Sequence, residues 1–311
     1  MCATDNQRNT HASHFSTVEK QVVGVQRAWH GKWEVTALLD GYFEALPDYM
    51  SAAPDDLMRT AHRWFLEGPH RVPVICFHLT DGTRSILVDA GTSTRMFPTL
   101  GALSPALAHA GIRTADVTDI LITHLHPDHV NGIATANGQR AFPTATIHVE
   151  RSEWHYWIHG DFTEATPNLQ LSAREARHAV AACSGQFQLF DAGDTLLGDV
   201  VSVAMPGHTI GHTGFMLECR SLFFVGDLLH LIPHQLDYPS MRVIFDVDHE
   251  QAAVTRTRVL AELVENRQRI AGAHIPFPGI GHIIGREGRY EFVADAWQFA
   301  PSVYKNDQPL T

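Results

Sequence analysis

The most chemically informative stretch of this sequence is THLHPDH, which places three histidines and one aspartate directly after an apolar segment. In an extended segment, His124 and His126 lie two positions apart and project to the same side. Pro127 prevents a helix from continuing through this point, so Asp128 and His129 point to a neighbouring position. The run can therefore offer two imidazoles to one metal ion, and a carboxylate and an imidazole to a second. Such ligands suit zinc, iron, manganese or cobalt.

The alternative interpretation of this run is a polar surface loop, because the chain contains 21 histidines and a histidine at the surface needs no partner. However, four polar groups crowded at the end of a buried strand would be costly to desolvate without a cation between them. Histidine is also the commonest metal ligand. We therefore interpret the run as part of a metal site.

Three later candidate ligands, like this run, each follow an apolar segment of the chain. His208, Asp227 and His274 each come shortly after an apolar segment with the composition of a strand. Taken singly, each has an ordinary structural explanation, as a capping aspartate or as a hydrogen-bonded histidine near the surface. Because all three accompany the upstream run, we expect them to complete the same site.

The order HLHPDH, then a single His, Asp and His, resembles the metallo-β-lactamase superfamily over about residues 75–290. The resemblance implies an α/β protein with the αβ/βα sandwich fold, in which two central mixed β-sheets are flanked by helices. It also implies a groove at the strand ends that holds two divalent metal ions per chain. Zinc is the expected ion, with iron, manganese or cobalt as alternatives.

The resemblance further implies which side chains hold each ion. Three imidazoles would hold the first ion, a carboxylate and two imidazoles the second, and a further carboxylate would bridge them. The first ion would be held by His124, His126 and His208, and the second by Asp128, His129 and His274. Asp227 would bridge the two ions. Asp89, in the segment LVDAG, resembles an acid that orients a ligating histidine through its other ring nitrogen.

Two further segments narrow the resemblance. GDLLH, which contains Asp227, and AHIPFPGIGH, which contains His274, are similar to the methyl parathion hydrolase group. That group cleaves phosphotriesters and is related to lactonases and arylesterases. The homoserine-lactone lactonases often carry a tyrosine three residues after the bridging aspartate, where it contacts the substrate carbonyl. This sequence has His230 at that position, which weakens the similarity to those lactonases.

The implied chemistry is hydrolysis by a metal-bridging hydroxide. Two cations about 3.5–4 Å apart can share a hydroxide, because metal binding lowers the pKa of water to about 7. This nucleophile would attack a carbonyl carbon or a phosphorus while one ion polarises the C=O or P=O oxygen. Asp128 and Asp227 are the predicted catalytic residues: Asp128 orients the nucleophile and passes a proton to the leaving group, and Asp227 bridges the ions. The sequence lacks the G-x-S-x-G run that would indicate a serine nucleophile.

The pocket around this site is predicted from the segments that border it in the resemblance. The aromatic and apolar candidates are Met96, Phe97, Trp154, Trp157 and Phe277. The histidines expected behind the ligands or at the rim are His212, His230 and His282. Packing in the core remains an equal alternative for each of these side chains.

Several functions remain open for such a site. An N-acyl-homoserine lactonase, another lactonase or an arylesterase would use the same ions and geometry. A glyoxalase II-like thioesterase would need basic residues for an anionic glutathione moiety, and this acidic chain shows no such cluster. An iron-dependent oxidoreductase, similar to sulfur dioxygenases or flavodiiron proteins, belongs to a different class, although no flavin-binding domain follows. A binding protein without activity is disfavoured because all seven ligand positions are filled.

The elements that must position these residues alternate short apolar strands with amphipathic helices, which is typical of layered α/β proteins. A D-G turn joins strands predicted over residues 72–79 and 85–88. Further strands are predicted over residues 119–123, 146–149, 200–204, 214–217, 221–225 and 268–273. Helices are predicted over residues 99–110, where Gly111 ends the helix, and over residues 151–157 and 249–264.

Composition limits the partners of this chain. Its 311 residues are 44% hydrophobic and carry a formal net charge of -11, which disfavours nucleic acid and anionic membranes. A small neutral or weakly charged ester-type substrate fits better. The four cysteines lack metal or disulfide spacing, so we expect reduced and mostly buried thiols.

The chain is predicted to form one domain over residues 31–311, because no linker or repeat interrupts it. Residues 1–30 are polar and are expected to form an N-terminal arm, which suggests a possible homodimer. The sequence lacks a signal peptide and an apolar run long enough to span a membrane, so a cytoplasmic location is expected.

Overall fold

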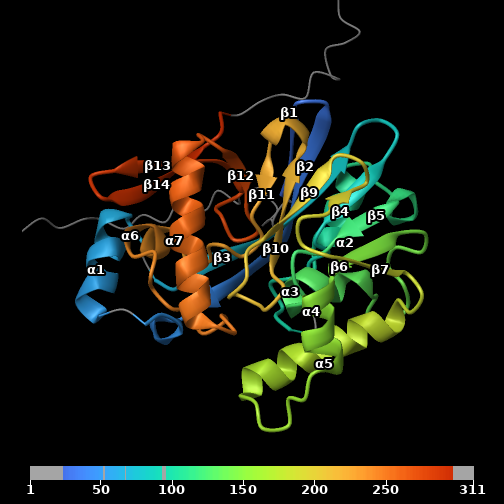
Figure 1. The fold of residues 1–311 in the computed structure, drawn as a ribbon, viewed down its shortest axis with the longest axis horizontal. Coiled ribbons are helices and arrows are strands. Elements are labelled where there is room, and N and C mark those ends of the chain that lie inside the picture. The colour runs from blue at the N-terminus through green and yellow to red at the C-terminus, as the bar shows by residue number, and fades with distance from the viewer. Residues whose placement is uncertain (1–23, 52, 67, 93–95, 297–311) are drawn as a thin grey trace, which may run out of the picture.

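Two seven-stranded β-sheets pack face to face, and helices cover their outer faces (Figure 1). The computed structural model describes residues 24–51, 53–66, 68–92 and 96–296. Both sheets are mixed, since each contains parallel and antiparallel neighbours. The sandwich predicted from the sequence is confirmed.

The first sheet is ordered as its strands follow one another in the chain. It consists of β1 (Val25–His30), β2 (Trp33–Ala45), β3 (His70–Thr80), β4 (Ser85–Val88), β5 (Asp119–Leu121), β6 (Thr146–Glu150) and β7 (Phe187–Phe190). Neighbours are antiparallel from β1 to β4 and parallel from β4 to β7.

The second sheet is also sequential. It consists of β8 (Thr195–Leu196), β9 (Val200–Ala204), β10 (Thr213–Leu217), β11 (Phe223–Phe224), β12 (Arg269–Ala271), β13 (Ile280–Arg286) and β14 (Arg289–Ala294). β11 and β12 are parallel, and the other neighbours are antiparallel.

Helices occupy the connections and the outer faces. The α-helices are α1 (Pro54–Arg63), α2 (Leu103–His109), α3 (Pro127–Val130), α4 (Arg151–Trp154), α5 (Pro167–Ala182), α6 (Ile232–Asp237) and α7 (His249–Glu265). Short 3₁₀ turns are η1 (Pro47–Tyr49), η2 (Thr114–Asp116), η3 (Asn131–Ile133) and η5 (Glu218–Arg220), and η4 (His155–His159) is a π-helical turn. None of the described helices is both long and apolar enough to cross a membrane.

Consecutive strand residues belong to different layers of the core, because the side chains of a strand point to opposite faces. In β3, Ile75 and Phe77 point into the layer between the sheets, whereas Cys76 faces the helices outside the first sheet. In β11, Phe224 joins the layer between the sheets and Phe223 faces α7. This alternation gives each sheet two apolar faces, so both faces must be covered.

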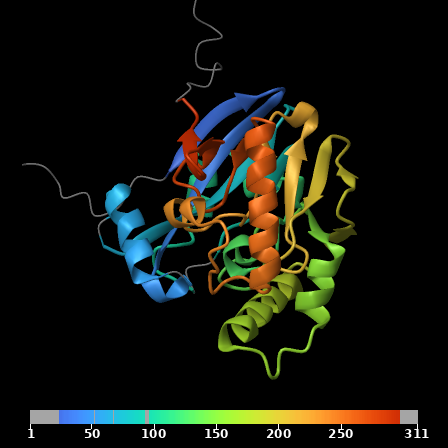
Figure 2. The same cartoon turned by 60° about the vertical axis from the view of Figure 1, so that its left-hand side comes forward.

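The two longest helices pack on different sheets, and Figure 2 shows α7 upright in the centre with α5 below it. The apolar side of α7 packs on the second sheet through Val259, Leu260 and Leu263. Ala173, Ala176 and Ala179 of α5 belong to the core cluster outside the first sheet. Both helices begin at a side-chain cap, since Thr166 accepts a hydrogen bond from the Leu169 amide and Asp248 accepts one from the Gln251 amide.

Most predicted elements are present, with shifted ends. The predicted D-G hairpin is β3–β4, and Gly111 follows α2 with a positive φ of 74°. The predicted helix over residues 99–110 begins only at Leu103, because Asp40 accepts hydrogen bonds from the Gly101 and Leu103 amides. Sequence patterns missed α1, α5, α6 and the strands β1, β2, β7, β8, β13 and β14.

The predicted boundary of the N-terminal arm is wrong. Residues 25–30 form β1, which pairs with β2 along its whole length, so the folded part begins before residue 31. Gln26 and Arg27 break the apolar period of this edge strand, which made it resemble a polar tail. The rest of the predicted arm, residues 1–23, lies outside the described residues. Cys76 and Cys183 are buried thiols as expected, Cys219 is exposed, and Cys2 lies outside the described residues.

Candidate metal centre

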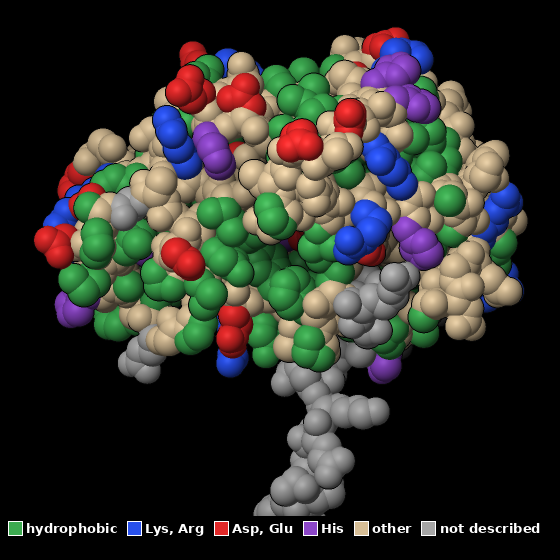
Figure 3. Space-filling view, turned by 90° about the horizontal axis from the view of Figure 1, so that it is seen from below, with side chains coloured by type: hydrophobic (Ala, Val, Ile, Leu, Met, Phe, Trp, Pro, Cys, Tyr) green, Lys and Arg blue, Asp and Glu red, His purple; other side chains and the backbone are tan. Residues whose placement is uncertain are grey.

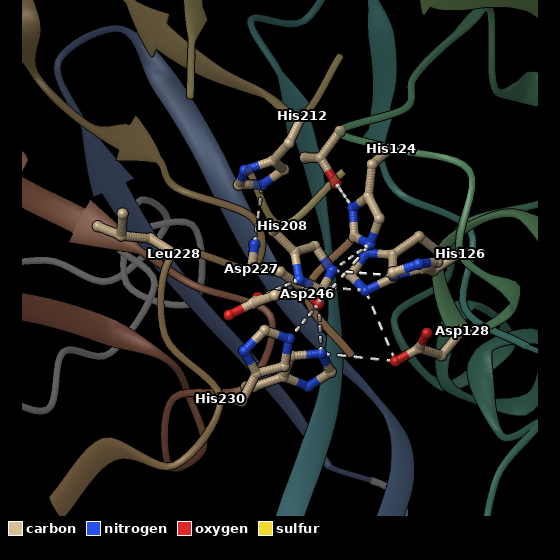
Figure 4. Close-up of polar contacts among 12 residues, drawn as sticks. His124, His126, Asp128, His208, His212, Asp227, Leu228, His230 and Asp246 are labelled. Atoms are coloured by element: carbon tan, nitrogen blue, oxygen red, sulfur yellow. Dashed lines mark hydrogen bonds and ion pairs between the residues drawn. The ribbon is translucent and has the colours of Figure 1, made fainter. Parts of the chain in front are cut away.

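The candidate ligands lie at one end of the sandwich, where strands of both sheets end (Figure 4). His124 follows the last residue of β5 by three positions, and Asp227 and His274 stand at the same distance after β11 and β12. His208 follows β9, which runs in the same direction as β11. Parallel strands carry their carboxyl ends to the same edge, so residues distant in the sequence converge there.

Three imidazoles form the first half of the site. His208 Nε2 lies 3.1 Å from His124 Nε2 and 2.9 Å from His126 Nδ1. The second ring nitrogen of His208, Nδ1, donates a hydrogen bond to Asp246 at 3.0 Å. The hydroxyl of Thr123 donates to Asp89 and can therefore only accept from His124 Nδ1. His124 Nε2 therefore carries a lone pair, which faces His208 Nε2.

A carboxylate and two imidazoles form the second half. Asp128 Oδ2 lies 3.6 Å from His129 Nε2 and 3.5 Å from His274 Nε2. Here too the other ring nitrogens are satisfied: His129 Nδ1 donates to Asp89 at 2.8 Å, and His274 Nδ1 donates to the Pro73 carbonyl at 2.7 Å. Pro127 opens α3, which places Asp128 and His129 in the first turn of that helix.

Asp227 lies between the two halves. Its Oδ1 is 3.1 Å from His129 Nε2, and its Oδ2 is 3.0 Å from His274 Nε2 and 3.3 Å from His208 Nε2. Its backbone amide donates to His212 Nε2, whose Nδ1 donates to a backbone carbonyl. Gly226 is required here, because a Cβ at this φ of 47° would lie 2.6 Å from His212 Nε2.

The charges of these groups favour a cation at the centre. Burial and neighbouring imidazoles lower the pKa of His124 and His126 well below 6.5, so these rings are neutral. Burial also opposes charge on His208, but the carboxylates of Asp227 and Asp246 outweigh it and raise its pKa to about 9. Asp227 itself is ionised, because the surrounding imidazoles overcome its burial and hold its pKa well below 3.8. A central carboxylate ringed by imidazoles therefore attracts positive charge.

The side chains present fit a pair of divalent ions. His129 Nε2 and Asp227 Oδ1 are buried and lie 3.1 Å apart as an ion pair, yet neither makes a hydrogen bond of good geometry among the described residues. Ligand atoms of His124, His126 and His208 lie within 4.8 Å of one another, as do those of Asp128, His129 and His274. Imidazole nitrogens and carboxylate oxygens are suitable donors for zinc and other transition metals.

Sequence reasoning missed two buried acids that hold the ligand loops. Asp246 accepts from His208, and Glu153 accepts hydrogen bonds from the amides of Leu125 and Gly211 at 2.8 and 2.9 Å. Glu153 therefore connects the segment between His124 and His126 with the loop after His208. Neither acid has a motif of its own, and in sequence Glu153 resembles any acidic residue in the first turn of a helix.

A cavity of about 380 Å³ opens over the ligands, and hydrophobic side chains surround the hollow seen from below in Figure 3. Its apolar wall consists mainly of Phe43, Tyr49, Met96, Phe97, Leu100, Leu169, Leu171, Ile244, Phe245 and Val247. The polar side chains on its floor are His126, Asp128, His208, Asp227, His230 and His274. The aromatic rings contact one another, since Phe245 packs edge-on against both Phe43 and Tyr49.

The predicted pocket residues divide into three groups. Met96 and Phe97 line the cavity, and His230 lies deeper than the predicted rim, with Nε2 3.0 Å from Asp227 Oδ2. Asp89, His212 and Trp157 lie behind ligands, Trp157 with its ring centroid 5.4 Å from that of His126.

The third group lies away from the cavity. Trp154 packs on Phe187 in the helical layer, and Phe277 packs against the cluster between the sheets. His282 lies on β13 beside Asp295. Trp154 and Phe277 therefore follow the core-packing alternative, whereas the His282 side chain is 31% exposed and lines neither the core nor the cavity. Sequence proximity to a ligand does not determine which way a side chain points.

Comparisons with known proteins agree with this geometry. The family model of the metallo-beta-lactamase superfamily matches residues 71–290, well over half of the chain. The hydrolase AbOPH of the beta lactamase superfamily superposes with a TM-score of 0.85 at 29% identity, covering 90% of this chain and 100% of that one. AidC, a dizinc quorum-quenching lactonase, superposes with a TM-score of 0.83 at 23% identity, covering 89% of this chain and 99% of AidC.

Similarity to curated proteins covers a smaller region. The hydroxyacylglutathione hydrolase of Vibrio cholerae is 31% identical over 129 residues, which are 42% of this chain and 40% of that enzyme. The probable metallo-hydrolase Rv2300c of Mycobacterium tuberculosis is 31% identical over 180 residues, which are 53% of this chain and 52% of that protein. The chain thus spans about half, or less, of the length of these two relatives.

Proposed function

The chain belongs to the metallo-β-lactamase superfamily, and from this premise we propose that it is a binuclear metal-dependent hydrolase of small ester-type substrates. The substrate class comprises phosphotriesters, aryl esters and lactones that are uncharged or weakly charged. The observation that supports this proposal is the convergence of seven ligand side chains beneath an apolar cavity.

The metal ions would be held by the residues that the sequence indicates. His124, His126 and His208 would hold one ion, Asp128, His129 and His274 the other, and Asp227 both. When bound, two divalent cations would supply a water that ionises near neutral pH and a Lewis acid for the carbonyl or phosphoryl oxygen.

The protein itself contributes orientation and proton handling. Asp89, Asp246 and the Pro73 carbonyl fix their histidines in the tautomer that turns the free nitrogen towards the centre. The side chain of Asp128 is 22% exposed and lines the cavity, so it can transfer a proton between the site and a leaving group. His230 also faces the cavity, where its imidazole can donate to a substrate oxygen.

The cavity favours a neutral substrate. The described residues that line it include Glu44, Asp128 and Asp246 but neither lysine nor arginine, so the anionic groups of a substrate that lie away from the metal ions would find no basic side chain. This observation disfavours a glutathione thioester, despite the similarity to a hydroxyacylglutathione hydrolase over 42% of the chain. The aromatic wall suits a flat or branched apolar group beside the ester.

Metal analysis combined with a substrate panel tests this proposal. We expect two metal equivalents per chain, loss of activity after complete chelation and recovery when zinc, manganese or cobalt is restored. On the panel, at least one class among lactones, aryl esters and phosphotriesters should be cleaved at least about tenfold faster than S-lactoylglutathione. Undiminished activity of the metal-free protein, or a preference for the anionic thioester, would contradict the proposal.

The iron-dependent alternative is tested with the same preparation. The iron-loaded protein is mixed with candidate thiol and persulfide substrates in an oxygen electrode. Hydrolysis predicts no oxygen consumption above that of iron alone. Sustained oxygen uptake that requires the folded protein would instead favour an oxidoreductase.

A further inference from the structure

A buried arginine on α7 is directed at the loops that carry the candidate ligands. Arg256 is only 1% exposed, and its guanidinium reaches away from the helix towards the segment that follows β11. Fully buried arginines are rare, because the charge must be removed from water. A position that retains one therefore needs partners strong enough to compensate the desolvation.

Arg256 makes four polar contacts, and three of them are to backbone carbonyls. Its Nε donates to the carbonyl of Leu228 at 3.0 Å. One terminal nitrogen donates to the carbonyls of Pro239 and Met241 at 2.8 and 2.9 Å, and the other donates to Asp246 Oδ2 at 3.3 Å. A planar group with five N–H donors can make these contacts at once, whereas an ammonium cannot.

Two of these contacts are one step from a candidate ligand. The other oxygen of Asp246 accepts from His208 Nδ1 at 3.0 Å, so the chain of contacts runs from Arg256 through Asp246 to the first metal position. Leu228 directly follows Asp227 (Figure 4), so the contact from Arg256 to the Leu228 carbonyl fixes the backbone beside the bridging carboxylate. A single guanidinium is therefore linked to the His208 imidazole through Asp246 and to the backbone of Asp227 through Leu228.

We propose that Arg256 and Asp246 are positioning residues that set the metal affinity of the site, an inference that rests on the proposed binuclear function. Asp246 holds the His208 ring in the productive tautomer, and Arg256 holds Asp246 and the Asp227 backbone in place. The competing explanation is that the pair only joins α7 to the loop and contributes stability. The two explanations differ in whether metal affinity changes in a protein that remains folded.

The experiment measures zinc affinity by competition with a chromophoric chelator, together with thermal unfolding of the metal-free proteins. The variants are Arg256→Met, Arg256→Lys, Asp246→Asn and the double variant Arg256→Met with Asp246→Asn. Removing one member of a buried ion pair leaves the other uncompensated and can prevent folding. The double variant leaves no buried charge unpaired, so it keeps the test decisive if a single variant fails to fold.

Arg258→Met is the matched control. Arg258 lies two residues after Arg256 on α7, has a side chain that is about half exposed, and pairs with Glu262 at 2.9 Å. Its replacement removes an arginine from the same helix without touching the ligand loops. We expect this variant to bind zinc as the wild-type protein does.

Loss of an outer partner of a ligand typically weakens metal binding by about 10–100-fold. We expect that range for Arg256→Met, Asp246→Asn and the double variant, and an intermediate loss for Arg256→Lys, which keeps the charge but not the carbonyl contacts. Lower thermal stability with unchanged zinc affinity would overturn the inference while leaving the proposed function intact. If the wild-type protein bound no metal, both this inference and the proposed function would fail.

Discussion

At the scale of single residues, the candidate centre is determined by which ring nitrogen of each histidine is already occupied. Asp89, Asp246 and the Pro73 carbonyl take the Nδ1 protons of His129, His208 and His274. The opposite nitrogens converge on Asp227, where each can carry either a proton or a metal ion. In a buried site such an arrangement is favourable only with positive charge at its centre.

Replacement of Asp227 by alanine removes the carboxylate that contacts both halves of the site. We expect the loss of at least one metal equivalent and a fall in kcat/KM of about 1,000-fold or more, since neither ion would keep its shared ligand. Metal analysis and steady-state kinetics measure the two effects, and circular dichroism checks that the variant is folded. A folded variant with full activity would refute the role of Asp227.

Replacement of Asp89 by asparagine tests the tautomer argument. The asparagine must accept from the Thr123 amide and hydroxyl and from His129 Nδ1, but it offers one acceptor oxygen in place of two. We therefore expect metal affinity to fall by about 10–100-fold. Asp116→Asn is a suitable control, because Asp116 is an exposed acid paired with Arg113. Equal zinc affinity of Asp89→Asn and the control would contradict the argument.

At the scale of elements, the wall of the cavity depends on a strand outside the metal centre. Asp40 of β2 is buried, and its carboxylate accepts hydrogen bonds from the amides of Thr92, Gly101 and Leu103. These contacts fix the chain on both sides of Met96 and Phe97, which line the cavity. Burial raises the pKa of Asp40 to about 6, although the three amides oppose that shift.

Asp40→Asn should therefore act on substrate binding more than on chemistry. One carboxylate oxygen becomes an NH₂ group that faces amide donors, and a buried donor without an acceptor costs about 1–3 kcal/mol. We expect KM to rise about tenfold, while kcat and metal content stay within about threefold of the wild-type values. Steady-state kinetics on the ester of the panel that is cleaved fastest measures KM and kcat separately. A fall in kcat with unchanged KM would show that the strand acts on the centre itself.

At the scale of the whole molecule, metal binding should stabilise a fold whose two sheets meet at the site. Ligands from both sheets converge there, so an ion binds the folded chain and finds no such arrangement in the unfolded one. An ion held at 1,000 times its Kd adds about 4 kcal/mol to the free energy of unfolding. We therefore expect chelation to lower Tm by several degrees or more.

The loss of thermal stability on chelation should grow with pH. In the metal-free protein the folded pKa of His208 is about 9 and its ordinary value is 6.5, so the folded state keeps a proton that the unfolded state releases. The stability from this proton is complete below pH 6.5 and is lost as pH rises through about 9. Bound metal replaces the proton, so the difference in Tm between loaded and metal-free protein should widen over this range. Thermal scans at intervals across it measure the effect, and a constant or narrowing difference would contradict the assignment of His208.

The sequence by itself determined the ligand types and the family resemblance, because H-x-H-x-D-H places its ligands through local geometry. Short apolar runs also predicted most strands, since a strand that is covered on both faces is apolar at consecutive positions. The tertiary structure decided what depends on distant segments. It brought Asp246 to His208 and Glu153 to the ligand loops, placed His230 beside Asp227, and moved Trp154, Phe277 and His282 away from the cavity. No local pattern encodes such contacts, because they arise from how strands far apart in the chain are stacked and where their ends meet.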